Sequence, residues 1–114
     1  MGDRGQVLIE DEGVYLYTHW NATKLVEDVR RALVRKERWG NSEYLARIIF
    51  CEMVGKDGFD CSTGYGISST KHGDAHRLVK VNSEKETVEV LKDGEREFKG
   101  TFSEFIDKFA PQPK

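Results

Sequence analysis

A change in the spacing of apolar residues near position 22 most constrains what this chain of 114 residues can fold into. Before it, residues 6–11 and 14–19 are extended runs joined by Glu12 and Gly13, which predicts a β-hairpin. After it, the period is helical from Thr23 to Trp39. The apolar residues that recur there at steps of three and four are Leu25, Val26, Val29 and Leu33. The chain therefore begins as two strands and a helix.

Start and stop signals divide the rest of the chain into further elements. Gly40 ends the first helix, and Asn41 or Ser42 caps a second one. Thr101 and Glu104 form a capping box before a third, short helix. Between these two helices, strands are predicted over residues 63–69, 77–82, 87–92 and 96–99.

The expected order of elements is β-β-α-α-β-β-β-β-α, and Asp93-Gly94 predicts a tight turn between the last two strands. Short links and hairpin signals favour a mainly antiparallel sheet with helices packed on one face, which is an α+β fold. We expect a single domain over residues 1–110 and a flexible tail over residues 111–114.

The run VYLYTH, residues 14–19, divides into two chemically different faces. Side chains alternate across a strand, so Val14, Leu16 and Thr18 share one face, which should meet the core. The other face carries an aromatic stripe, formed by Tyr15, Tyr17 and His19. The functional hypotheses below depend on this division.

Charge and composition restrict the partners. The 18 Lys and Arg residues nearly balance the 20 Asp and Glu residues, and the net charge of −2 argues against nucleic acid as a partner. The basic run that ends the first helix is interpreted as a solvated face: Arg30, Arg31, Arg35, Lys36 and Arg38. The longest apolar run, residues 48–51, is too short to span a bilayer. We expect no membrane association and a soluble, cytoplasmic protein.

Two short motifs could hold a ligand. In YTHWN, His19 could act as a general base or ligand contact, with Trp20 as a stacking wall and Asn21 as a polar anchor. The alternative is structural, with Asn21 capping the helix, Trp20 covering a corner and His19 bonding a backbone group. In CSTGYGISS, Gly64 and Gly66 leave one strand face almost bare, which a planar ligand or a neighbouring aromatic ring could fill.

Metal and cofactor sites are not predicted. His72, Asp74 and His76 lie close together, but Cys51 and Cys61 are too far apart for the usual close cysteine pair of a structural zinc site. The glycine spacing also differs from the phosphate-loop and dinucleotide-binding patterns.

Four stretches together, MGDRGQV, VYLYTHWN, YLARIIFCEMV and TGYGIS, resemble a family of short bacterial, archaeal and phage proteins without an established activity. The similarity covers most of residues 2–82. It singles out eight positions: Asp3, Arg4, His19, Trp20, Thr63, Gly64, Tyr65 and Gly66. In relatives the residue after the tryptophan is often Gly or Asp, whereas this chain has Asn21, so the resemblance does not extend to an acid-dependent role there.

Two functions remain as hypotheses. The first is a non-enzymatic binding module whose aromatic strand face and His-Trp corner contact a protein partner, such as a second copy of the chain. The second is a small-molecule-binding protein or hydrolase-like enzyme, with His19 as acid or base, Arg4 as anion clamp and Ser62 or Thr63 as hydroxyl donor.

Overall fold

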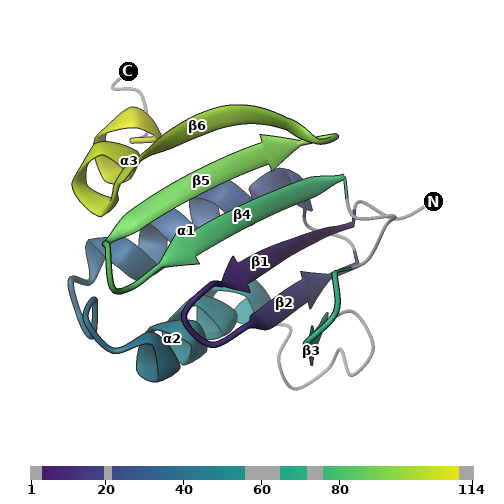
Figure 1. Ribbon diagram of the computed structural model, residues 1–114, viewed down its shortest axis with the longest axis horizontal. Helices are drawn as coiled ribbons and strands as arrows, with labels where there is room; N and C mark the ends of the chain where they lie inside the picture. The colour runs from purple at the N-terminus through teal and green to yellow at the C-terminus, as the bar shows by residue number, and fades with distance from the viewer. Residues whose placement is uncertain (1–3, 20–21, 56–64, 72–75, 111–114) are drawn as a thin grey trace.

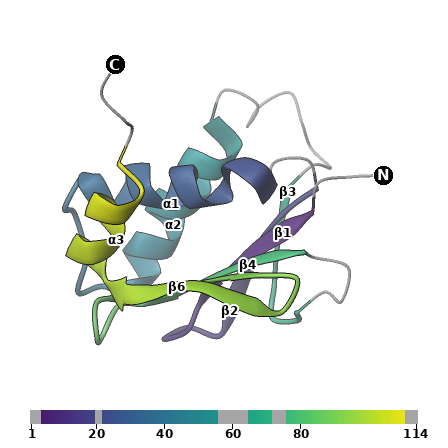
Figure 2. The same cartoon turned by 90° about the horizontal axis from the view of Figure 1, so that it is seen from above.

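Six strands form one mixed sheet, and three α-helices lie together on one of its faces (Figures 1 and 2). The computed structural model describes residues 4–19, 22–55, 65–71 and 76–110. The strands are β1 (Gly5–Ile9), β2 (Val14–Thr18), β3 (Tyr65–Ser68), β4 (Arg77–Asn82), β5 (Thr87–Lys92) and β6 (Glu95–Thr101). The helices are the 3-10 helix η1 (Ala22–Lys24), α1 (Leu25–Val34), α2 (Ser42–Val54) and α3 (Phe102–Lys108). The expected order of strands and α-helices is confirmed.

The sheet is not wholly antiparallel, because its strand order is β3-β2-β1-β4-β5-β6 and β1 pairs with β4 in parallel. The other four pairs of neighbouring strands are antiparallel. Two helices and β3 separate the first hairpin from β4 in the sequence, so β4 is free to add to the outer edge of β1 in either direction. The expectation of a mainly antiparallel sheet is therefore correct, and the parallel pair is a feature that hairpin signals do not reveal.

One face of β2 packs against the core and the other does not, as the alternation of its side chains predicts. Leu16 and Thr18 are buried, and Val14 packs against the core. Tyr15 and Tyr17 are half-buried on the opposite face, which carries no helix (Figure 2). The core between sheet and helices is built from aliphatic residues of β1, β4 and β5, from the inward faces of α1 and α2, and from Phe102 and Phe105 of α3.

The first α-helix is shorter than the expected 23–39. It ends at Val34, and both Lys36 and Arg38 have positive φ angles, of 55° and 58°. Trp39 then folds back, donating from Nε1 to the Leu33 carbonyl at 2.9 Å, and its ring packs edge-on against Phe102. Tertiary burial of this indole therefore ends the helix before Gly40 does.

Local turn and cap signals are confirmed where they fall on described residues. Asp93 and Gly94 both have positive φ, as the tight β5–β6 turn requires. Asn41 caps α2 by accepting from the Tyr44 amide, and Thr101 begins α3 with a complete capping box. No helix in the described ranges is both long and apolar enough to cross a membrane.

Candidate functional site

The end of the sheet where β1 begins and β2 ends gathers several of the singled-out residues. Gly5 pairs with Thr18 on one side and with Arg77 on the other, and Thr18 pairs with Tyr65. Arg4 directly precedes this row and His19 directly follows it, so both lie at the same end of the sheet. His76 joins them, because its amide donates to the Arg4 carbonyl at 3.0 Å.

His19 has a partner that the motif YTHWN alone did not suggest. The Tyr17 hydroxyl lies 3.3 Å from His19 Nδ1, and the two rings meet edge-on with centroids 6.3 Å apart. Both side chains are half-buried. Residues two apart on a strand share a face, so the alternation that defines the aromatic stripe could have predicted this pair. A histidine that acts as acid or base is usually oriented by a neighbouring polar group, and the Tyr17 hydroxyl is placed to serve as that group.

The helix-free face continues from this end across β3, β2 and β1. Tyr17 lies between Gly66 of β3 and Gln6 of β1, while Tyr15 lies beside Leu8. No described atom lies within 4 Å of the position a Cβ would take at Gly66, the residue paired with Tyr17. The expected pairing of the glycine strand with the tyrosine strand is confirmed.

Gln6 was not singled out by sequence reasoning, although it is completely buried on this face. Its Nε2 donates to the Thr70 carbonyl at 3.2 Å. Thr70, two residues after the end of β3, therefore lies at Gln6 on the helix-free face. A polar residue in a strand gives no sign of such a partner, because residue 70 lies far away in the sequence.

Only some of the predicted ligand residues lie in the part of the chain that the structure describes. Arg4, His19, Tyr65 and Gly66 lie at the sheet end discussed above, and Arg4, His19 and Tyr65 each take part in an interaction. The others lie outside the described residues: Asp3, Trp20, Asn21, Thr63 and Gly64. The predicted helix cap at Asn21 falls there too, while the N-cap of α1, Lys24, makes no side-chain cap bond.

The basic run at the end of α1 is not simply solvated. Arg31 pairs with Glu27 and Asp28 on its own helix, and both Arg31 and Arg35 pair with Glu52 of α2. The side chains of Arg31 and Arg35 are still 43% and 44% exposed. The interpretation of this run as a solvated face therefore holds in part, and these arginines also join two helices.

Asp28 is the one buried carboxyl of this cluster among the described residues. Burial raises its pKa to about 6, while the charge of Arg31 and its hydrogen bond oppose that rise. Burial is the larger effect because it removes water from a charged group. Neither the burial nor the shift was foreseen from the sequence, in which Asp28 resembles its exposed neighbour Glu27.

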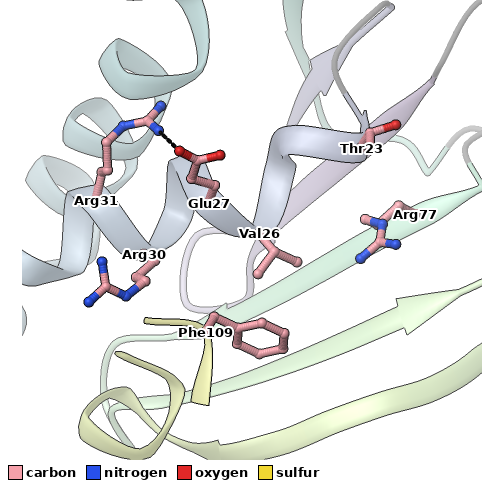
Figure 3. Close-up of a pocket in the computed structure, with 7 residues that line it drawn as sticks. All are labelled: Thr23, Val26, Glu27, Arg30, Arg31, Arg77 and Phe109. Carbon is pink, nitrogen blue, oxygen red and sulfur yellow. Dashed lines mark ion pairs between the residues drawn. The ribbon is translucent and has the colours of Figure 1, made fainter. Parts of the chain in front are cut away.

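A concave region lies on the helix side of the sheet (Figure 3). This cavity of about 580 Å³ is bounded by α1, by the start of β4 and by the residue that follows α3. Its lining is Thr23, Val26, Glu27, Arg30, Arg31, Arg77 and Phe109. Within the described ranges, no group of three His, Cys, Asp or Glu side chains could hold a metal ion. His72, Asp74 and Cys61 lie outside those ranges.

Comparison of the chain with protein-family models, with curated proteins and with solved structures found no match. The resemblance carried by the Gly-Asp-Arg, Tyr-x-His-Trp and Thr-Gly-Tyr-Gly-Ile motifs therefore stays a prediction.

Proposed function

We propose that this protein is a non-enzymatic binding module that uses the helix-free face of its sheet, and that its partner is a second copy of the same chain. The observation that carries the proposal is the one-sided arrangement of the fold: all three α-helices pack on one face. The other face presents Leu8, Tyr15 and Tyr17, which are half-buried and adjacent across β1 and β2. Aromatic side chains are enriched at protein interfaces.

The charges on the same face favour a self-complementary contact. Lys80, Glu89 and Lys99 form one row across β4, β5 and β6, so that opposite signs alternate along it. Two copies related by a two-fold axis present the same patch to each other. With the axis between Lys80 and Glu89, Lys80 of each copy lies opposite Glu89 of the other.

Light scattering and native mass spectrometry over a range of protein concentrations test the proposal. We expect a dimer that Tyr15→Ser and Tyr17→Ser weaken. Tyr44→Ser is the matched control, because Tyr44 is a 52% exposed tyrosine on α2, stacked under Arg38 on the other side of the molecule. A wild-type protein that stays monomeric at every concentration would end the proposal.

The contact between Tyr17 and His19 favours a second candidate, a small-molecule-binding or hydrolase-like site at the sheet end. In it His19 would act as acid or base, Arg4 would hold an anionic group and Thr63 would donate a hydroxyl. Support comes from the shared position of Arg4 and His19 beyond the Gly5–Thr18 pair and from the hydroxyl that orients the imidazole. Hydrolysis of p-nitrophenyl esters tests it, because His19→Gln should abolish activity while His76→Gln should not. Equal rates in wild type and His19→Gln would contradict it.

A further inference from the structure

We infer that β3 is a docking edge, at which the β3 strands of two copies of the chain pair antiparallel and join their sheets. The strand order β3-β2-β1-β4-β5-β6 puts β3 at one edge of the sheet and β6 at the other (Figure 1). Among the described residues, β3 pairs with β2 alone. The backbone N–H and C=O groups on the outer side of an edge strand can pair with another extended chain.

The two edges of the sheet differ in charge. The strand β6 carries four charged residues, Glu95, Arg96, Glu97 and Lys99. Charged side chains on an edge strand oppose its pairing with another chain, because that pairing would remove them from water. The strand β3 has the sequence YGIS and carries no charge. It is therefore the edge that a second strand can approach without burying a charge.

Ile67 is the apolar side chain that a second strand would cover. Its side of β3 is the helix side, where its cross-strand partner Leu16 is buried in the core, yet Ile67 is 62% exposed. On the opposite face of β3, a Cβ at Gly66 would meet no described atom within 4 Å. A strand added beside β3 removes the Ile67 side chain from water, which favours the contact.

A second copy of β3 fits this edge. Residues that face each other in an antiparallel pair point to the same face, so a strand pairs with its own copy only in registers centred on one residue. With the two-fold axis at Gly66, Tyr65 of each copy lies opposite Ile67 of the other. Pairs of an aromatic and a β-branched side chain stabilise antiparallel strands. No like charges meet across this axis, because β3 carries none.

Disulfide cross-linking tests the pairing and its register. In a chain with Cys51→Ser and Cys61→Ser, Gly66→Cys introduces the only thiol. Residues opposite each other in an antiparallel pair have Cα atoms about 4.5–5.5 Å apart, which a disulfide can bridge. We therefore expect Gly66→Cys to form a covalent dimer with oxidised glutathione.

Ser68→Cys in the same background is the matched control, on the same strand and the same face. In the inferred register the two copies of residue 68 lie four positions apart along the strand, about 13 Å, which is too far for a disulfide. Absence of a covalent dimer with Gly66→Cys, or equal cross-linking with Ser68→Cys, would overturn the inference.

Sedimentation and native mass spectrometry of a second pair of variants test the contact without cross-linking. Ile67→Lys should weaken the edge association about tenfold, because it removes both contacts between Tyr65 and Ile67 and places two like charges near the axis. Val34→Lys is the matched control, since Val34 is a 44% exposed apolar residue on α1. Unchanged association in Ile67→Lys, or an equal loss in Val34→Lys, would contradict pairing through β3.

Lys80→Glu separates this contact from the dimer proposed above. Lys80 lies on β4, three strands away from β3, and its replacement puts like charges opposite each other on the helix-free face. We expect cross-linking through Gly66→Cys to survive Lys80→Glu, and its loss would overturn the inference. Association that Ile67→Lys abolishes and Lys80→Glu leaves unchanged would support the edge contact while the proposed dimer fails.

Discussion

The Nε2 of Gln6 donates a hydrogen bond to the carbonyl oxygen of Thr70 across 64 positions of sequence, at a point where the glutamine is fully buried. This bond attaches the chain that follows β3 to the helix-free face of the sheet. Its contribution to stability can be measured.

Gln6→Ala should lower the free energy of unfolding by about 2–3 kcal/mol, because it removes a buried hydrogen bond and leaves a cavity. Urea denaturation followed by circular dichroism measures the change. Lys108→Ala is the control, since Lys108 is exposed on α3, away from the proposed dimer surface, and its loss should cost under about 0.5 kcal/mol. Equal stability of Gln6→Ala and wild type would show that the connection does not depend on this amide.

Gly5→Ala should destabilise the fold, whereas Gly66→Ala should not. A Cβ at Gly5 would lie 2.8 Å from the Ala22 Cβ and 3.0 Å from the Arg77 carbonyl oxygen, so η1 or β4 would have to move. At Gly66 the same atom meets no described neighbour within 4 Å. We expect a loss of about 1–3 kcal/mol for the first change and under about 0.5 kcal/mol for the second, measured by urea denaturation. Similar losses at both positions would contradict the close packing of η1 on β1.

Asp28 should make stability depend on pH between about 4 and 6. Burial raises the pKa of Asp28 from its usual 3.8 to about 6 in the folded state, so folding takes up a proton within this window. The contribution of Asp28 to the free energy of unfolding is therefore greatest below pH 4 and falls as the pH rises through 6, by up to about 3 kcal/mol. The stability of wild type relative to Asp28→Asn, measured at several pH values, isolates this change.

An NMR titration of the Asp28 carboxyl carbon provides an independent check, with an expected midpoint near pH 6. A midpoint near 4 would mean that the charge and hydrogen bond of Arg31 outweigh burial. Glu52 should behave in the opposite sense: despite burial, its hydrogen bonds to Arg31 and Arg35 lower its pKa. Its stabilising contribution is therefore lost as the pH falls below about 4.5.

Glu52→Gln should weaken the ion pairs that hold α2 against the end of α1. Glu52 pairs with both Arg31 and Arg35, and its side chain is only 17% exposed. Because the two arginines are partly solvated, we expect a loss of about 1 kcal/mol at low salt and less at high salt. Thermal melting at two salt concentrations measures it, with Glu43→Gln as the control at an exposed position on the same helix. A salt-independent loss would point to packing instead of charge.

Local signals in the sequence were sufficient for the order of the elements. The alternation in residues 14–19, the helical period of α1 and α2, the Asp93-Gly94 turn and the capping box at Thr101 each depend on neighbours within a few residues. Such signals act through backbone geometry and side-chain direction, which are the same wherever the segment lies. They also predicted that the glycine strand would join the tyrosine strand in one sheet.

The tertiary structure alone decided the parallel pairing of β1 with β4, the early end of α1 at Val34 and the burial of Gln6 and Asp28. It also brought Arg30, Arg77 and Phe109 to one cavity, although they lie on three elements far apart in the sequence. Each of these features depends on a contact between distant segments, and neither the spacing of apolar residues nor a short motif carries information about which distant segments meet. Residue types and strand faces follow from the sequence itself, whereas the partners of each polar side chain follow from the packing of the whole chain.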